Sequence, residues 1–128
     1  MNILFIGDIV GAAGRNIVFQ YLKQLKKDYD IDFVIANGEN SAHGKGISYK
    51  IYERFKSEGI DCITMGNHSF SKREVIAHLD KMNDMVVPYN YPEDLHEGYK
   101  VFYVNGLRLC VINLLGSALM HPNRQDPF

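Results

Sequence analysis

The stretch Phe33-Val34-Ile35-Ala36-Asn37-Gly38-Glu39-Asn40 decides the fold, because four apolar residues in a row give way at once to polar ones. Short apolar runs of this kind are typical of strands that are buried on both faces. Two other stretches have the same form: Ile3-Leu4-Phe5-Ile6 is closed by Gly7-Asp8, and Cys62-Ile63-Thr64-Met65 is closed by Gly66-Asn67-His68. The sequence therefore predicts three buried strands, each followed by glycine and polar side chains.

Amphipathic segments follow these strands. The first has apolar residues at helical spacing with lysines on the opposite face; its apolar residues are Ile17, Val18, Tyr21, Leu22 and Leu25. A second helix is predicted over residues 48–58, and it ends at Gly59. Ser71, with Glu74 three residues later, has the form of a capping box that opens a third helix.

The order of these elements predicts an α/β fold. Strands that alternate with helices favour a parallel sheet covered by helices. Met85-Val86-Val87 is a candidate fourth strand, and two apolar runs then flank Asn105-Gly106, which is a strong hairpin signal. We therefore expect a βαβαβα unit followed by a β-hairpin.

The composition indicates an ordinary globular domain. The chain has 128 residues, of which 46% are hydrophobic and 23% charged. Its net charge of -1 gives no sign of a strongly basic nucleic-acid binder. Cys62 and Cys110 lie in apolar runs, which we interpret as two buried thiols in a reduced, cytoplasmic setting. No apolar run approaches the length of a membrane span, so we expect no membrane partner.

The polar residues behind the three strands form the candidate site. They are Asp8, Glu39, Asn40, Asn67 and His68. The carboxyl ends of parallel strands share one edge of a sheet, where ligands bind, so we expect these residues to meet there. Two carboxylates and two amide oxygens suit Mg²⁺, Mn²⁺ or ferrous iron, and two such ions can clamp a phosphoryl group. His68 could then protonate a leaving oxygen. We attribute the preceding glycines to tight backbone turns.

Competing interpretations exist for the same residues. Taken singly, an Asp or Asn behind a strand is more often a turn residue or a helix cap. The glycines from Gly7 to Gly14 and from Gly38 to Gly46 resemble a dinucleotide fingerprint and a P-loop, but neither has the required spacing. An acidic residue in each of these loops favours a cation over an anion. Lys45 could still meet a substrate phosphate, and Arg15 is interpreted as solvated.

At Gly7-Asp8, Gly38-Glu39-Asn40 and Gly66-Asn67-His68 the sequence resembles the calcineurin-like metallophosphoesterases. It is most similar to their YmdB-like branch, known as 2′,3′-cyclic-nucleotide phosphodiesterases. Val111-Ile112-Asn113-Leu114 and Asp126-Pro127-Phe128 extend the resemblance along the whole chain.

The resemblance implies stacked sheets flanked by helices, a dinuclear centre of iron or manganese, and hydrolysis of phosphodiester bonds in cyclic nucleotides. It implies that Asp8, Glu39, Asn40 and Asn67 are metal ligands, with Glu39 bridging, and that His68 is the proton donor. It further implies a small nucleotide or phosphodiester substrate, with RNA as a further candidate partner, and assembly into a homo-oligomer.

The sequence departs from this family in one respect. The resemblance implies a second half that supplies further histidine ligands, including a His-x-His pair, and the sequence has no such pair. We therefore expect residues 1–128 to be the N-terminal part of a single metallophosphoesterase domain whose C-terminal half is absent. The alternative function is an inactive fragment that acts as a nucleotide-binding, phosphate-binding or oligomerisation module.

Overall fold

A computed structural model describes residues 1–91, 95 and 97–116 of the chain. The expectation for Asp126-Pro127-Phe128 lies outside these residues. The elements follow one another in this order: β1 (Ile3–Ile6), α1 (Gly11–Asp28), β2 (Phe33–Asn37), α2 (Tyr49–Ser57), β3 (Cys62–Thr64), the 3₁₀ helix η1 (Arg73–Lys81), β4 (Met85–Val86), β5 (Tyr99–Val104) and β6 (Leu107–Ile112). The alternation of strands and helices matches the sequence-based prediction.

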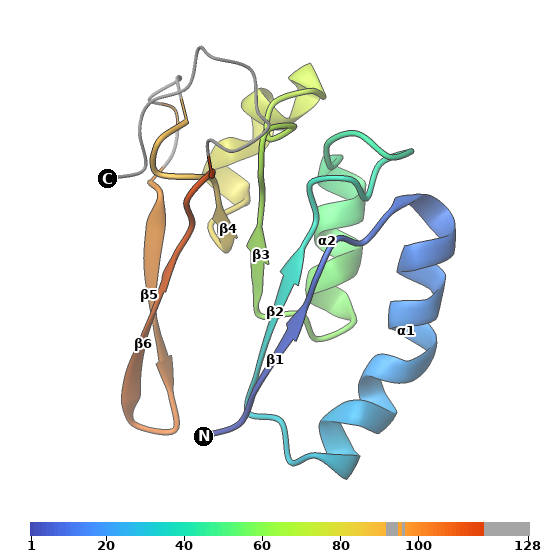
Figure 1. Ribbon diagram of the computed structural model, residues 1–128, viewed down its shortest axis with the longest axis vertical. Coiled ribbons are helices and arrows are strands. Elements are labelled where there is room, and N and C mark those ends of the chain that lie inside the picture. The colour runs from blue at the N-terminus through green and yellow to red at the C-terminus, as the bar shows by residue number, and fades with distance from the viewer. Residues whose placement is uncertain (92–94, 96, 117–128) are drawn as a thin grey trace.

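The first four strands form one parallel sheet in the order β1-β2-β3-β4 (Figure 1). Ile6 pairs with Ala36, and Ala36 pairs with Ile63, so the ends of β1, β2 and β3 are level with one another. The strands β5 and β6 form an antiparallel pair joined at Asn105-Gly106, where both residues have positive φ. The predicted parallel sheet and the predicted hairpin are both confirmed.

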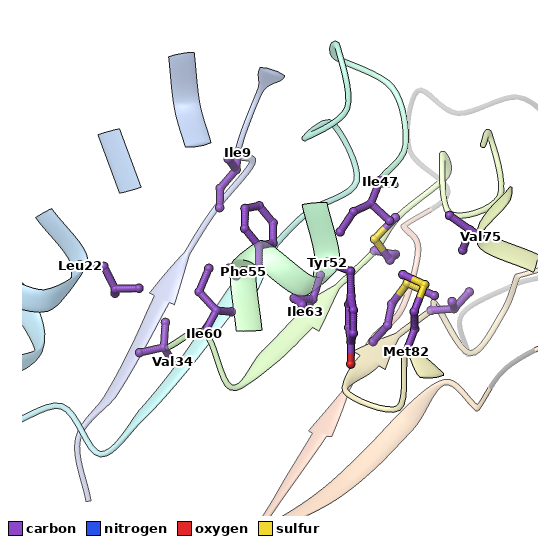
Figure 2. Packing of buried hydrophobic residues seen from close by; sticks show 14 residues of the cluster. Ile9, Leu22, Val34, Ile47, Tyr52, Phe55, Ile60, Ile63, Val75 and Met82 are labelled. Atoms are coloured by element: carbon purple, nitrogen blue, oxygen red, sulfur yellow. The ribbon is translucent and has the colours of Figure 1, made fainter. Parts of the chain in front are cut away.

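The main core lies between the sheet and its helices. Figure 2 shows Leu22 of α1 and Phe55 of α2 packed over Val34 of β2 and Ile63 of β3, all of them buried. Helices α1 and α2 lie on the same side of the sheet (Figure 1). Burying side chains of this size stabilises the fold by about 1.5–3 kcal/mol each. The helices therefore hold the sheet from one face only.

The β5–β6 hairpin covers part of the other face of the sheet. Phe33 of β2 meets Phe102 of β5 edge to face, with ring centroids 4.8 Å apart. Because β2 is covered on both faces, its side chains form a continuous apolar run, as the sequence suggested. The hairpin does not cover β1 in the same way, and Phe5 remains 60% exposed. The second layer of the fold is therefore narrower than the sheet beneath it.

The predicted capping box at Ser71 is wrong. The third helix begins at Arg73, is a 3₁₀ helix, and has Lys72 as a cap that makes no side-chain hydrogen bond. Ser71 is instead part of the turn before the helix, because its N–H donates to the carbonyl of His68 at 3.2 Å. The cap predicted for α2 does form, since Ser48 Oγ accepts from the N–H of Ile51 at 3.2 Å.

The cysteines differ in their surroundings. Both are free thiols, and Cys62 is buried as expected, but Cys110 is exposed. Successive side chains of a strand point to opposite faces, and on β6 it is Leu109 and Val111 that pack toward the sheet. Burial raises the pKa of the Cys62 thiol to about 12. Within the described part of the chain, no helix combines the length and apolar character needed to span a bilayer.

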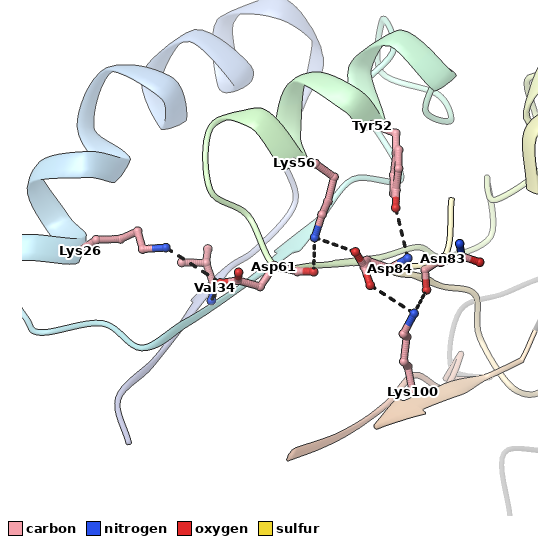
Figure 3. A network of polar contacts seen from close by, with 8 residues as sticks. All are labelled: Lys26, Val34, Tyr52, Lys56, Asp61, Asn83, Asp84 and Lys100. Atoms are coloured by element: carbon pink, nitrogen blue, oxygen red, sulfur yellow. Dashed lines mark hydrogen bonds and ion pairs between the residues drawn. The ribbon is translucent and has the colours of Figure 1, made fainter. Parts of the chain in front are cut away.

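Asp84 ties the hairpin to the sheet and to α2. Its carboxylate lies 2.8 Å from Lys56 Nζ and 3.1 Å from Lys100 Nζ (Figure 3). Its backbone N–H donates to the hydroxyl of Tyr52 at 3.1 Å. Burial raises the pKa of Asp84, but hydrogen bonds from Lys56 and Lys100 outweigh this effect and bring the pKa below the usual 3.8. The carboxylate form is therefore favoured in the folded chain.

This network predicts an acid-sensitive contribution to stability. Because the pKa of Asp84 is lower in the folded state, its contribution is complete above the unfolded-state pKa and is lost as pH falls through the folded-state pKa. We expect Asp84→Asn to lower the unfolding free energy near neutral pH and to lessen its fall below about pH 4. Urea denaturation across pH measures this, with exposed Asp80→Asn as the control. Identical acid profiles for the wild type and Asp84→Asn would contradict the assignment.

Candidate active site

A chain of hydrogen bonds joins the loops that follow the first three strands. The side-chain amide of Asn40 donates to Asp8 Oδ1 at 2.7 Å, and Asn40 Oδ1 lies 3.1 Å from His68 Nδ1. These loops lie together at the edge of the sheet where β1, β2 and β3 end (Figure 1). The structure therefore brings together three of the predicted residues, which are some thirty positions apart in the sequence.

The bond to Asp8 settles the orientation of the other two side chains. An ionised carboxylate only accepts hydrogen bonds, so the Asn40 atom that faces Asp8 must be the NH₂ group. The oxygen of Asn40 then faces His68, and His68 Nδ1 must carry the proton that bonds to it. The Nε2 atom of His68 is therefore not used in this contact. When the ring is protonated, Nε2 is also a donor.

Glu39 lies against the backbone of Gly66. A Cβ atom built on Gly66 would lie only 1.5 Å from Glu39 Oε2, so no larger residue fits at position 66 without displacing the carboxylate. Oε2 is buried and has no hydrogen-bond partner among the described residues. A buried charged oxygen without a partner is costly unless something else compensates it. The arrangement is therefore suited to a bound cation at this oxygen.

Asn67 follows Gly66 directly, on the same turn as His68. Its carbonyl oxygen lies 3.5 Å from the hydroxyl of Tyr91. The side chain is partly buried, and none of the hydrogen bonds among the described residues joins it to Asp8 or Asn40. Its role as a metal ligand therefore stays a prediction.

The loops after β2 and β3 are built from the same turn. In each, a fully buried serine stands three residues after the glycine, and its hydroxyl donates to the carbonyl of that glycine. The distance is 2.7 Å from Ser41 to Gly38 and 2.6 Å from Ser69 to Gly66, and each serine N–H donates to the same carbonyl. The two intervening residues carry the candidate site. Sequence reasoning missed both serines, although the repeated Gly-x-x-Ser spacing signals them.

Crowding accounts for two of the three glycines at the strand ends. None of Gly7, Gly38 and Gly66 has a positive φ, so a left-handed backbone conformation does not explain them. Gly38 and Gly66 are needed for space, since a Cβ on Gly38 would lie 2.9 Å from Ile63 Cγ2. The left-handed backbone after β1 belongs to Asp8 itself, with φ 37°. Such a conformation is uncommon for a residue other than glycine and often accompanies function.

Arg15 supports the loop after β2, which corrects its interpretation as a solvated side chain. Its guanidinium donates to the carbonyl of Ser41. The N–H of Gly11 donates to the carbonyl of Asn40 at 3.0 Å, so the start of α1 holds the same loop from a second point. The loop is thus fixed to the first helix, and the side chain of Asn40 is held beside Asp8.

The donors at this edge suit a hard divalent cation. Asp8 Oδ2 and both oxygens of Glu39 are outside the hydrogen bonds described above. Asn40 Oδ1 has a second lone pair beyond the one that His68 uses. Carboxylate and amide oxygens are the ligands that Mg²⁺, Mn²⁺ and ferrous iron accept. Within the described residues, no group of three or more His, Cys, Asp and Glu side chains is arranged to hold a metal. The donor set fits a metal, but as an incomplete coordination shell.

The fold and the site define this chain as an α/β protein with a polar strand-end site. Residues 4–128 match the family model described as YmdB-like protein, so the chain belongs to this family. It is 47% identical to the 2′,3′-cyclic-nucleotide 2′-phosphodiesterase of Bacillus subtilis strain 168, over 100% of this chain and 48% of that protein. The chain therefore spans about half the length of the curated relatives it matches.

Solved structures show the same fold. A phosphatase from Mycoplasma pneumoniae matches with a TM-score of 0.90 and 40% identity, over 98% of this chain and 47% of that one. A hypothetical protein from Thermus thermophilus matches with a TM-score of 0.88 and 36% identity, over 99% and 49% of the two chains. These matches confirm the expected α/β fold class, which the chain shares with a phosphatase.

The packing of Glu39 on Gly66 gives a direct test. Gly66→Ala should lower the unfolding free energy by about 1–3 kcal/mol, because the added methyl group overlaps the carboxylate. Gly7→Ala is the matched control, because nothing lies within 4 Å of its Cβ position and its φ is not positive. We expect the control to change stability by less than about 1 kcal/mol.

A double-mutant cycle assigns the cost of this substitution to one contact. In a Glu39→Ala background the oxygen that overlaps the new methyl group is gone, so Gly66→Ala should cost clearly less than it does in the wild type. Urea denaturation of the four proteins measures the coupling. An equal cost in both backgrounds would show that Glu39 does not occupy the space beside Gly66.

Proposed function

We propose that this chain is part of a metal-dependent phosphodiesterase that hydrolyses 2′,3′-cyclic nucleotides. One observation carries the proposal: the hydrogen-bond chain from Asp8 through Asn40 to His68 gathers a carboxylate, an amide and an imidazole at one edge, with Glu39 close by. The name of the Bacillus relative supports the substrate class. We propose manganese or iron as the metal, with magnesium as a third candidate.

The ligands in this proposal are Asp8, Glu39, Asn40 and Asn67, with Glu39 bridging two ions. The buried Oε2 of Glu39, which lacks a partner in the described structure, supports its role as a ligand. Two bound divalent ions would supply charge to polarise the phosphate and would lower the pKa of a water molecule. Since the oxygen donors form an incomplete shell, further ligands are needed, and the second half of the relatives is the source that we propose.

His68 is the proposed general acid. The bond from Nδ1 to Asn40 orients the imidazole ring, so Nε2 is the atom available to give a proton to the leaving oxygen of the ribose. Asn40 is itself oriented by Asp8, and the proton donor and two proposed ligands therefore belong to one connected unit. Removing Asn40 would disturb the ring as well as the ligand set. In this scheme Asp8 and Glu39 provide negative charge for the ions, and His68 provides the proton.

A second candidate is a module that binds nucleotide or phosphate, or that pairs with another copy of the chain, without turnover. The exposed apolar side chains on β1 favour it, since Phe5 is 60% and Ile3 is 40% exposed. Large apolar side chains gathered on an uncovered face are common at interfaces. The second candidate therefore requires no catalysis by this chain alone, and a turnover measurement separates it from the first.

The test is hydrolysis of 2′,3′-cyclic AMP by the purified chain, with Mn²⁺ and with a chelator, and by a version extended to the length of its relatives. We expect at least one of these two versions to hydrolyse the substrate, and we expect the chelator to abolish this hydrolysis. Glu39→Gln, which keeps the shape and removes the charge, should reduce kcat/KM by about a hundredfold or more. Glu53→Gln on α2 is the control and should leave the rate unchanged.

The outcomes distinguish the two candidates. Turnover only in the extended version would make the present chain an inactive half and would support the second candidate for it. If neither version hydrolyses 2′,3′-cyclic AMP, the phosphodiesterase proposal is contradicted. Full activity in Glu39→Gln would remove Glu39 from the bridging role.

A further inference from the structure

A second cavity lies beside the candidate site. It has a volume of about 430 Å³ and lies between the loop after β2 and the start of η1. Its polar lining consists of His43, Ser48, Ser71, Lys72, Arg73 and Glu74. None of these residues belongs to the proposed catalytic or metal-binding set, so the cavity is available for a separate role.

The cavity adjoins the candidate site through Gly46. A Cβ atom built on Gly46 would lie 3.2 Å from Lys72 Cγ and 3.4 Å from the carbonyl oxygen of His68. The N–H of Gly46 donates to the carbonyl of Glu39 at 2.5 Å, so the same residue touches the loops that carry both Glu39 and His68. The cavity and the strand-end site are therefore built on the same two loops, which meet at Gly46.

Among the described residues, the cations of this cavity have no acidic partner, unlike the lysines of the two cavities beside the hairpin. In the part of the chain that the structure describes, Lys72 and Arg73 form no ion pair. The cavities beside the hairpin contain Lys56 and Lys100, and each of these lysines forms an ion pair with Asp84. The single acidic residue in the lining beside η1 is Glu74, so the formal charge there is positive. Such a cavity attracts anions.

His43 adds a donor from the opposite wall. It is exposed, it lines the cavity, and its backbone is left-handed, with φ 57°. Ser48 Oγ accepts the N–H of Ile51, which leaves its hydroxyl proton free to donate outward. An imidazole, hydroxyl groups and two cationic side chains are the groups that bind phosphate oxygens.

We propose that this cavity is a second phosphate subsite, and that the substrate is an oligoribonucleotide whose terminal 2′,3′-cyclic phosphate is hydrolysed. The inference rests on the proposed function of the strand-end site. A cyclic mononucleotide carries a single phosphate, which the strand-end site would hold, so it leaves the cations beside η1 without a partner. An oligoribonucleotide carries a further phosphate one nucleotide away, and in this proposal Lys72 and Arg73, which line the cavity, bind it.

Two ligands that differ by one nucleotide test this proposal. Adenosine 3′-monophosphate and the dinucleotide ApAp carry the same terminal phosphate, but only ApAp has an additional phosphodiester. Their dissociation constants are measured by isothermal titration calorimetry with the chain in the presence of Mn²⁺. We expect the chain to bind ApAp more tightly, and the variant Lys72→Gln/Arg73→Gln to lose about tenfold in affinity for ApAp alone.

Matched variants guard against indirect effects. Lys81→Gln removes a charge from the other end of η1 and should change neither dissociation constant. Arg73→Gln alone, at an exposed position, covers the case in which the double variant folds poorly, and it should show a smaller loss in the same direction.

The proposed subsite is overturned if ApAp binds no more tightly than adenosine 3′-monophosphate. It is also overturned if neither ligand binds. An equal loss for both ligands in the Lys72 and Arg73 variants overturns it as well. Failure of the proposed function is seen separately, as absence of 2′,3′-cyclic AMP hydrolysis while the selective loss of ApAp affinity persists.

Discussion

The hydrogen-bond chain from Asp8 through Asn40 to His68 is the constraint on which the rest of this structure depends. It exists only because β1, β2 and β3 run parallel and end level with one another. A shift of register by one residue would turn each strand over and carry its apolar side chains away from the helices. The packing that stabilises the sheet therefore also fixes the distances within the site.

Two buried serines and two crowded glycines shape the loops at the strand ends that carry the candidate site. The Gly-x-x-Ser turns close on themselves through Ser41 and Ser69, and each presents two candidate residues toward the same edge. Glu39 occupies the space that a side chain at Gly66 would fill, and one of its oxygens has no partner in the described structure. Local structure is thus arranged around a carboxylate oxygen that no group among the described residues compensates. Such uncompensated groups are expected at functional sites rather than in a core.

Much of this fold could be predicted because the deciding signals are local. Each strand is an apolar run that ends in glycine and a polar residue, so strands such as β2 could be predicted from the sequence alone. The convergence of Asp8, Asn40 and His68 then followed from the parallel topology of the sheet. Features set by tertiary contacts were beyond such reasoning. The contact of Arg15 with the loop after β2 needs α1 in place, and the exposure of Cys110 depends on which face of the hairpin meets the sheet.

The prediction that a helix starts at Ser71 was wrong for a related reason. Its spacing from Glu74 fits a capping box, but the preceding turn uses the N–H of Ser71 to bond His68, and the helix starts two residues later. The crowding around Gly38 and Gly66 was also not foreseen, because contact with a side chain from elsewhere in the chain leaves no mark in the local sequence. Gly66 shows this most clearly, since only the structure reveals Glu39 beside it.

The central claim is that the strand-end edge binds a divalent cation through Glu39 and Asp8. The most direct measurement is anomalous diffraction from crystals of the chain grown with Mn²⁺. The account predicts an anomalous peak within about 2.0–2.3 Å of a carboxylate oxygen of Glu39, with Asp8 or Asn40 as a second ligand. A well-ordered edge with no peak beside Glu39, or a peak held only by residues elsewhere in the chain, would contradict it.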